Sequence, residues 1–285
     1  MTDIFVKDTV AVITGAASGI GRAAALHCAR AGMKLAMVDI NAGKLDAARR
    51  QIAGIAGDDN VIAEPVDVAN AEAMHGLATI VVTRWQAPAL LMNNAAAFVA
   101  GGAGGILDPL ENWQKLFAVN LFGAINGTLA FLPDMLAAGR RARIVNTGSK
   151  QGLTNPPGNP AYNTTKAAVN AYTQNLARDL RDRPGGKVSA HLLVPGWTTT
   201  GDAEHRPGAW LPDQVIAYLA EALGRDAFFI ICPDDETTSE MDKKRILWNA
   251  LDIVLDRPAL SRWHNDHKAA FAEFMQQDLP KGWGG

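Results

Sequence analysis

Short apolar segments alternate with longer amphipathic segments along most of the chain. Several short segments are apolar at nearly every position, which is typical of strands covered on both faces. The segments between them are long enough to form crossover helices. The predicted strands span residues 9–16, 34–40, 60–68, 89–95, 143–149 and 187–196.

This alternation predicts an α/β fold: a doubly wound, Rossmann-type parallel sheet with helices on both faces. After Gly196 the alternation stops, and we expect a helix over 212–224, a last strand over 227–232 and two helices over 237–256 and 261–277. The prediction is a single domain over 1–285, with a core of about residues 5–232 and a C-terminal helical extension over about 233–285. Because such sheets bind ligands at the carboxyl ends of their strands, residues that follow strands are candidate site residues.

Composition narrows the classes of function. The 285 residues are 48% hydrophobic, enough for a large core, and the net charge of -2 gives no reason to expect nucleic acid or an anionic membrane as partner. Two cysteines are too few for a disulfide framework, and no signal peptide is visible. The most apolar window, residues 87–107, is interrupted by Asn and Gly and predicts a strand running into a loop. We expect a cytoplasmic protein.

A glycine-rich segment, TGAASGIG at residues 14–21, follows the first predicted strand and opens the first helix. Gly15, Gly19 and Gly21 allow a tight turn and the close approach of a pyrophosphate to the helix N-terminus, where N–H groups and the helix dipole favour an anion. A glycine-rich turn alone is weak support, but its place between strand and helix is what a dinucleotide site requires.

Asp39 stands at the end of the second predicted strand, about 20 residues beyond that segment. An acid there can accept hydrogen bonds from an adenosine ribose and would repel a 2′-phosphate. Neither Ser18 before Gly19 nor Ile40 after Asp39 supplies a cation. The sequence therefore predicts NAD rather than NADP; the alternative is an ordinary acid at a strand-end turn.

Tyr162 and Lys166 lie in AYNTTK, at the head of a long predicted helix. Four residues make about one turn, so the two side chains share a face. A solvated Tyr beside a surface Lys would explain this pair on its own.

Taken together, these motifs make the sequence resemble the short-chain dehydrogenase/reductase family over about residues 5–200. The matches are Thr14, Gly15, Gly19 and Gly21 to TGxxxGxG; Tyr162 and Lys166 to the Tyr-x-x-x-Lys pair; Ser149 to the catalytic Ser thirteen positions earlier; Asn120 to the helix Asn; Asp67 to the acid after the third strand; and Pro195 with Gly196 to the Pro-Gly after the sixth strand. The resemblance implies cofactor contacts from Gly15, Ser18, Gly19, Ile20, Gly21, Asp39, Asp67, Val68, Asn94, Tyr162, Lys166, Pro195, Gly196, Thr198 and Thr200.

The implied activity is NAD-dependent interconversion of a secondary alcohol and a ketone. Tyr162 would be the acid–base group; a free Tyr has a pKa of about 10, and the nearby Lys166 cation would lower it. The resemblance gives Lys166 a ribose contact, Ser149 the substrate oxygen, and Asn120 a water that relays protons between Lys166 and solvent. His264 and His267 are expected to be an exposed helix face, not a metal site.

The sequence departs from the family pattern in two places: the loop that the resemblance puts beside the nicotinamide, which contains Ala96, and the substrate end. NNAA at residues 93–96 replaces the family's NNAG, and FFIICPDDE with two helices replaces the Gly-rich ending. Trp197, Trp210, Phe228 and Phe229 suggest a bulky, apolar substrate lining, although aromatic residues are more often core. The rival functions are a non-catalytic NAD-binding regulator and an epimerase or dehydratase with bound NAD, whose usual GxxGxxG spacing is absent.

Two further expectations concern assembly. The helices over 112–138 and 161–182 carry more apolar residues than one sheet face can cover, and related proteins pair through the matching helices as dimers or tetramers. In the extension, residues 236–277 show an apolar stripe at helical spacing: Met241, Ile246, Leu247, Leu251, Val254 and Leu255. We expect that segment to pack near the substrate opening or across a subunit boundary; the alternative is a plain packing addition.

Overall fold

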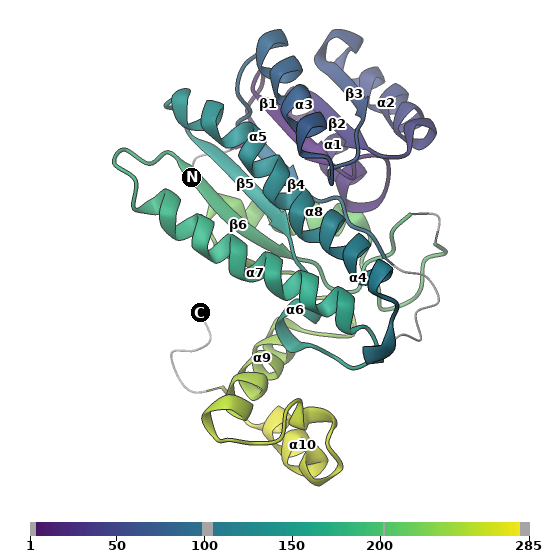
Figure 1. Ribbon diagram of the computed structural model, residues 1–285, viewed down its shortest axis with the longest axis vertical. Helices are drawn as coiled ribbons and strands as arrows, with labels where there is room; N and C mark the ends of the chain where they lie inside the picture. The colour runs from purple at the N-terminus through teal and green to yellow at the C-terminus, as the bar shows by residue number, and fades with distance from the viewer. Residues whose placement is uncertain (1–3, 99–104, 202, 280–285) are drawn as a thin grey trace.

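The computed structural model describes residues 4–98, 105–201 and 203–279. Within them one parallel sheet runs in the order β3-β2-β1-β4-β5-β6-β7 (Figure 1). Its strands are β1 (Val10–Thr14), β2 (Lys34–Asp39), β3 (Val61–Pro65), β4 (Leu90–Asn93), β5 (Ala142–Thr147), β6 (Val188–Val194) and β7 (Phe229–Ile231). The predicted doubly wound fold is confirmed, and the order reverses between β1 and β4, where such sheets bind ligands.

Helices cover both faces of the sheet (Figure 1). The helices of the described residues are α1 (Gly19–Arg30), α2 (Ala42–Ala56), α3 (Ala71–Arg84), α4 (Leu110–Leu116), α5 (Gly123–Ala137), α6 (Gln151–Thr154), α7 (Pro160–Arg181), α8 (Pro212–Gly224), α9 (Ser239–Val254) and α10 (Lys268–Gln276), of which α9 and α10 do not lie on a face of the sheet. Short 3₁₀ turns lie at Asp58–Asn60, Gly105–Leu107, Ser261–Trp263 and Asn265–His267. Part of the loop predicted within residues 87–107, including Gly101, Gly102 and Gly104, lies outside the described residues.

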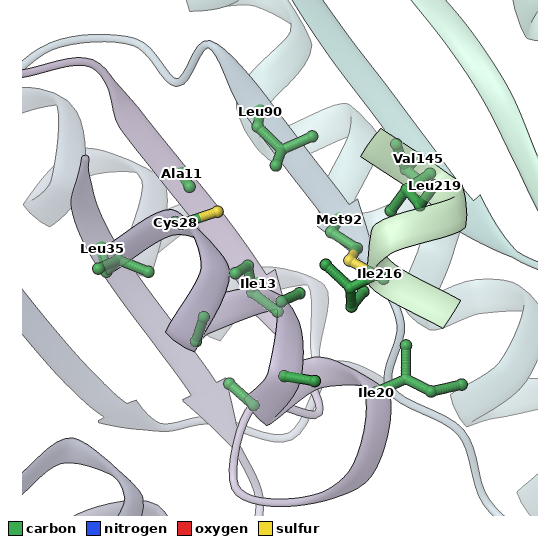
Figure 2. Packing of buried hydrophobic residues seen from close by; sticks show 14 of the residues in the cluster. Ala11, Ile13, Ile20, Cys28, Leu35, Leu90, Met92, Val145, Ile216 and Leu219 are labelled. Atoms are coloured by element: carbon green, nitrogen blue, oxygen red, sulfur yellow. The ribbon is translucent and has the colours of Figure 1, made fainter. Parts of the chain in front are cut away.

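Strand β1 shows why its sequence is apolar throughout. Ala11 and Ile13 face a core shared with α1, α2 and α8, and Val10 and Val12 face a second core shared with α3, α5 and α7. Figure 2 shows the first core, where side chains of α1 and α8 lie over those of the central strands. Because both faces are covered, each position in β1 is buried.

Strand register brings the candidate site residues to one edge of the sheet. Ile13 pairs with both Met37 and Met92, so the glycine-rich turn, Asp39 and the segment after β4 begin side by side. Thr147 pairs with Leu193 in the same way, so the segments after β5 and β6 are also neighbours. The topology alone therefore gathers residues that are far apart in the sequence.

A continuous helical run links α4 and α5 through a π-helical stretch (Phe117–Phe122). This run, Leu110–Ala137, is long and apolar enough to cross a membrane by length and composition. Half of its most apolar window is buried, however, and Phe131 and Met135 lie in the core beneath the sheet. A core helix of a globular domain has the same features.

The predicted C-terminal helices form, and they stand apart from the sheet (Figure 1). Trp248 of α9 lies against Phe271 and Phe274 of α10, with ring centroids 5.2 Å away in both cases. The expected apolar stripe is only partly buried: the buried residues of α9 are Asp242, Lys244, Trp248 and Asp252. The buried side of α9 is therefore made of ion-paired side chains and Trp248 rather than of a run of aliphatic side chains. Val254 and Leu255 are exposed in the single chain, so packing of this end of the stripe across a subunit boundary stays a prediction.

Candidate active site

A cavity of about 740 Å³ opens at the carboxyl ends of the strands. It brings together most of the predicted site residues: Gly15, Ser18, Gly19, Ile20, Asp39, Asn94, Ser149, Tyr162, Lys166, Pro195, Gly196, Thr198 and Thr200. Gly21, Asp67, Val68 and Asn120 do not line it. Residues at or just after the ends of β1, β2, β4, β5 and β6 thus share one concave site with residues of α7, as the topology requires.

The glycine-rich turn is built around close backbone contacts. Gly15 has φ of 67°, and a Cβ on Gly21 would lie 2.1 Å from the Gly15 carbonyl oxygen, so neither position accommodates a side chain. Ser18 precedes α1 in an extended conformation, and its hydroxyl makes no capping hydrogen bond. No side chain therefore caps the first turn of α1, which leaves its N–H groups able to face an anion in the cavity.

Asp39 closes the other side of this turn. Its carboxylate accepts hydrogen bonds from the backbone N–H groups of Ala17, at 3.1 Å, and Asn41, at 3.0 Å. These bonds hold the carboxylate at the rim of the cavity, where each oxygen keeps a free lone pair. Asp67, by contrast, is exposed and accepts from Ala69 N–H, and Val68 is buried against Gly123.

Ser149, Tyr162 and Lys166 meet because α6 and α7 pack without a gap. A Cβ on Gly152 in α6 would lie 2.5 Å from the Lys166 carbonyl carbon, so the glycine lets the two helices touch beside Ser149. Pro160 occupies the first turn of α7, and the Asn159 side chain caps the Tyr162 N–H. The helix therefore starts immediately before Tyr162, which fixes the direction of its ring.

The two titratable groups of α7 are both buried. Burial raises the pKa of Tyr162 to about 12, against an opposing effect of its hydrogen bond with Ser149. Burial also lowers the pKa of Lys166 to about 8, which leaves that ammonium mostly charged at neutral pH. Lys166 was predicted to lower the pKa of Tyr162, but burial raises it within the chain, and the effect that opposes burial comes from Ser149.

Lys166 Nζ is held in place by a backbone acceptor. It donates to the Thr147 carbonyl oxygen at 2.8 Å and lies 5.7 Å from the centre of the Tyr162 ring. Only 2% of Lys166 is exposed, so this cation is fixed below the phenol and faces the cavity. Its charge can therefore act on Tyr162 without screening by bulk water.

Asn120 lies in the π-helical stretch, behind the cavity wall. Its Oδ1 accepts from Ala97 N–H at 2.7 Å, and its Nδ2 donates to the Ala97 carbonyl and to Thr165 Oγ1, both at 3.2 Å. The side chain thus ties the segment after β4 to α7. These contacts indicate a positioning role for Asn120, and its predicted part in a proton relay stays a prediction.

Asn94 is fastened to the glycine-rich turn through Thr14. Thr14 Oγ1 accepts from the N–H groups of Asn94, at 2.9 Å, and Ala95, at 3.0 Å. Asn94 Nδ2 donates in turn to the Thr14 carbonyl at 3.1 Å. Ala96, which replaces the family's Gly, lines the cavity beside this clamp.

The loop after β6 reaches across the cavity toward α1. Thr198 Oγ1 donates to the Gly196 carbonyl at 3.0 Å, so its side chain is used within the loop. The Thr200 side chain lies 3.1 Å from where a Cβ of Gly19 would be. The loop therefore closes over the start of α1.

The predicted aromatic lining is corrected by the structure. Trp197 lines the cavity, but Phe228 and Phe229 border a different cavity at the opposite, amino-terminal edge of β6. Trp210 instead donates from Nε1 to Asp235 and packs on Tyr218. Sequence position explains the error, because Phe228 and Phe229 begin the last strand and the site lies where strands end.

Phe98 lines the cavity and was not predicted. Its ring stacks on Tyr162 with centroids 4.9 Å apart, which covers one face of the phenol. Lys150, Gln151 and Asp234 also line the cavity and were not predicted. Lys150 follows Ser149 directly and Asp234 follows β7, so the rule that site residues follow strands could have found both.

The structure is a doubly wound α/β protein with a glycine-rich turn and a Ser, a Tyr and a Lys in one cavity at the carboxyl ends of its strands. The sequence pattern described as short chain dehydrogenase matches residues 9–207. The chain belongs to the short-chain dehydrogenase/reductase family.

Individual relatives support this membership. The 1-deoxy-11-beta-hydroxypentalenate dehydrogenase of Streptomyces arenae is 31% identical over 267 residues, which cover 89% of this chain and 92% of that protein. A short-chain dehydrogenase/reductase from Burkholderia phymatum in complex with NAD has a TM-score of 0.80 at 30% identity, covering 90% of this chain and 98% of that one. An alcohol dehydrogenase from Thermococcus sibiricus complexed with 5-hydroxy-NADP has a TM-score of 0.68 at 25% identity, covering 76% and 91%.

Proposed function

We propose that the protein is an NAD-dependent dehydrogenase or reductase that interconverts a secondary alcohol and a ketone. The observation that carries this proposal is that Ser149, Tyr162 and Lys166 line the same cavity as the glycine-rich turn and Asp39. A dinucleotide site and an acid–base group in one cavity are what hydride transfer to or from a carbonyl carbon requires.

The residues present fit a dinucleotide. The uncapped first turn of α1 and the glycines beside it leave room for a pyrophosphate against backbone N–H groups. Asp39 presents a carboxylate to the rim, which favours a ribose diol and disfavours a 2′-phosphate. Relatives are known with NAD and with NADP, so the choice of NAD rests on Asp39.

The bound nicotinamide would accept or supply the hydride; the chain's own residues handle the proton and the orientation. Ser149 and Tyr162 hydroxyls lie together and would both contact the substrate oxygen. When an alcohol is oxidised, its hydroxyl proton passes to the Tyr162 oxygen; when a ketone is reduced, Tyr162 returns it. Lys166 favours the phenolate form during this exchange by its charge.

The substrate is proposed to be bulky, apolar and uncharged. Phe98 and Trp197 give the cavity apolar surface. Among the described lining residues the cations are Lys150 and Lys166, and both are already engaged: Lys150 with Asp234, Lys166 with the Thr147 carbonyl. A substrate carboxylate or phosphate would therefore find no uncommitted cation in this lining, and its desolvation would be uncompensated.

The test measures turnover of a panel of secondary alcohols with NAD and of ketones with NADH, and the change in nicotinamide absorbance reports the reaction. Turnover of a neutral, bulky member that disappears in Tyr162→Phe would support the proposal. The rival, a regulator that binds NAD without chemistry, predicts NAD binding by calorimetry with no turnover of any panel member. The intact Ser149, Tyr162 and Lys166 set favours the enzyme.

We also propose that the protein assembles through α5 and α7. Phe122 lies immediately before α5, and Leu129 lies within it. Both side chains are large and apolar, yet each is more than half exposed. A two-fold pair would bury this face against its copy.

A further inference from the structure

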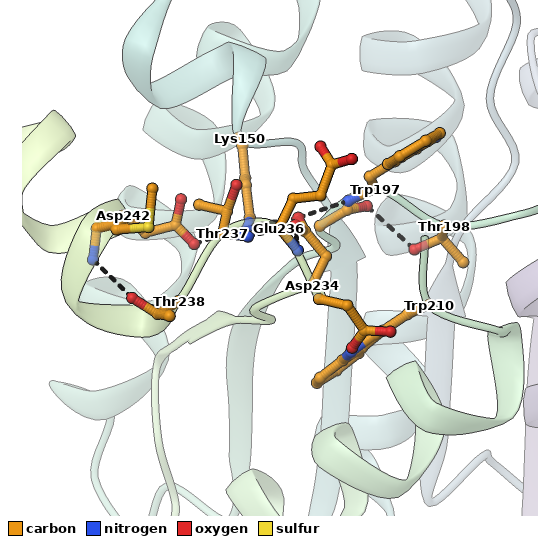
Figure 3. Close-up of polar contacts among 12 residues, drawn as sticks. Lys150, Trp197, Thr198, Trp210, Asp234, Glu236, Thr237, Thr238 and Asp242 are labelled. Atoms are coloured by element: carbon orange, nitrogen blue, oxygen red, sulfur yellow. Dashed lines mark hydrogen bonds and ion pairs between the residues drawn. The ribbon is translucent and has the colours of Figure 1, made fainter. Parts of the chain in front are cut away.

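Lys150 lies between the reactive end of the cavity and the C-terminal segment. It follows Ser149 directly, and its Nζ is 2.9 Å from Asp234 Oδ2 and 2.7 Å from Asp242 Oδ2 (Figure 3). Lys150, Asp234 and Asp242 are 19%, 4% and 6% exposed at their side chains. Such a buried arrangement persists only where geometry and partners offset the loss of hydration.

Asp234 is the most fully bonded member of this cluster. Its Oδ2 accepts from Lys150 Nζ and from Trp197 N–H at 3.0 Å, and its Oδ1 accepts from the N–H groups of Glu236, at 3.2 Å, and Thr237, at 2.8 Å. One carboxylate thus joins the segments that follow β5, β6 and β7. Gly196 makes this possible, because a Cβ there would lie 2.6 Å from Asp234 Oδ2.

The bond to Trp197 anchors the base of a loop. Trp210 N–H donates to the Trp197 carbonyl at 2.8 Å, so the loop that leaves β6 at Trp197 returns beside its own start. Thr198 and Thr200, which line the cavity, are in this loop. The position of the Trp197 backbone therefore sets where the loop meets the cavity.

Asp242 differs from Asp234 in what it holds. It sits in the first turn of α9, outside the cavity lining. Its Oδ2 forms an ion pair with Lys150 Nζ at 2.7 Å. Asp242 thus gives Lys150 a second carboxylate but has no bond to the loop after β6.

We infer that the Lys150–Asp234 pair is a positioning device of the active site: it fixes Ser149, at the end of β5, relative to the Trp197 loop, at the end of β6. The inference rests on the proposed function for its kinetic consequences. Lys150 and Asp234 act through Ser149 and Trp197, so both are positioning residues. Because small misplacements of reacting groups reduce rate steeply, loss of the pair lowers turnover while the NAD-binding turn on β1 and β2 stays in place.

Asp234→Asn and Asp242→Asn form a matched pair. Each removes one negative charge from the same cluster and leaves Lys150 with one carboxylate. Only Asp234→Asn also removes hydrogen bonds to the loop after β6, because an amide has a single acceptor oxygen. If that oxygen accepts from the N–H groups of Glu236 and Thr237, the NH₂ group of the amide faces the Trp197 N–H and Lys150, which are donors too.

The kinetic measurement compares both variants with the full wild-type chain, using the best neutral alcohol or ketone of the panel. We expect Asp234→Asn to lower kcat/KM by at least about tenfold. The NAD dissociation constant should rise by less than that, because the glycine-rich turn and Asp39 stay in place and only Thr198 and Thr200 move with the loop. Asp242→Asn should stay within about twofold on both measures, since the Lys150–Asp234 bond remains. Equal losses in the two variants, or no loss in Asp234→Asn, would overturn the inference.

Limited proteolysis supplies a readout that does not depend on turnover. Glu204 lies exposed in the loop between Trp197 and Trp210, and a Glu-specific protease can cut there once the loop detaches. Mass spectrometry should show the fragment ending at Glu204 forming at least about tenfold faster in Asp234→Asn than in Asp242→Asn. Equal rates would show that Asp234 does not hold the loop, and would also overturn the inference.

A second variant covers the case in which Asp234→Asn does not fold. Lys150→Met with Asp242→Asn removes one charge of each sign and leaves the Asp234 bonds to Trp197, Glu236 and Thr237 intact. We expect kcat to fall by about tenfold while cleavage at Glu204 stays at the wild-type rate, because only the link to Ser149 is lost. Unchanged kcat would overturn the inference. A wild-type chain that turns over no panel member refutes the proposed function instead, and the Glu204 comparison then decides the inference alone.

Discussion

Tyr162→Phe removes a single oxygen from the reactive end of the cavity. The ring that remains still stacks on Phe98 and still lies above Lys166 Nζ. The lost hydrogen bond with Ser149 is worth about 1 kcal/mol, and the variant no longer buries a phenol hydroxyl, so the melting temperature should shift by no more than a few degrees, roughly. The glycine-rich turn and Asp39 are untouched, so NAD affinity should stay within about threefold.

Turnover should respond quite differently. No other described titratable group occupies the position of the Tyr162 hydroxyl, and loss of general acid–base catalysis lowers rates by about 10² to 10⁴. That range corresponds to about 3–5.5 kcal/mol of transition-state stabilisation. In the proposed mechanism the Tyr162 phenolate is the base. The value of kcat/KM for alcohol oxidation by the wild-type protein should therefore rise with pH from neutrality, and this rise should vanish in Tyr162→Phe.

Tyr172→Phe is the matched control. Tyr172 stands on the same helix, and burial raises its pKa as well, but its hydroxyl bonds with Thr128 and it does not line the cavity. Steady-state kinetics on both variants, with NAD titrations by calorimetry, make the comparison. Near-normal turnover in Tyr162→Phe, or an equal loss in Tyr172→Phe, would refute the assignment of Tyr162 as the acid–base group.

Three further outcomes are expected. Asp39→Ala should weaken NAD binding by about tenfold or more and narrow the gap to NADP, since a charge-assisted bond is worth about 1.5–3 kcal/mol; equal NAD affinity by calorimetry would contradict this. Lys166→Met should flatten the pH dependence of stability: the pKa of Lys166 is about 8 when folded and 10.5 when unfolded, so the unfolded chain binds more protons in that window and the free energy of unfolding rises with pH there. Urea denaturation of both proteins at about pH 7.5 and about pH 9.5 measures it, and an unchanged slope would count against it. Leu129→Lys should shift the mass found by light scattering toward the monomer, whereas a wild-type chain that is already monomeric at micromolar concentration would rule out the proposed assembly.

The sheet and the glycine-rich turn could be predicted because their signals are local. Strands buried on both faces need apolar residues at every position, and β1 has them. The Gly21 Cβ would collide with the Gly15 carbonyl, so the spacing of those glycines follows from the turn itself. Helix α7 was predictable for a similar reason, because Asn159 and Pro160 mark its start.

The substrate end could not be predicted in the same way. Phe98 reaches Tyr162 only through the path of the segment after β4, and nothing in its neighbours along the chain indicates that contact. Phe228 was assigned to the site by residue type, and its place at the start of a strand put it at the wrong edge of the sheet. Residue type alone suggested that Phe228 lines the site, but the direction of the strand determines at which edge of the sheet it lies.

The pKa of Tyr162 could not be predicted from its spacing to Lys166 alone, because it also depends on burial. One turn of helix does place Lys166 beside Tyr162, as the spacing predicted, yet burial raises the pKa of the phenol and lowers that of the ammonium at the same time. A buried cation and a buried phenol are each disfavoured in charged form, and they favour one another only when both are charged. The phenolate therefore needs a further positive charge in the cavity, and an oxidised nicotinamide is such a charge. In the proposed mechanism, Tyr162 therefore acts as the acid–base group only when the cofactor is bound. A pH titration of Tyr162 should give a lower pKa in the NAD complex than in the free protein. Equal values in the two states would mean that Lys166 alone must suffice, and the burial argument would then be wrong.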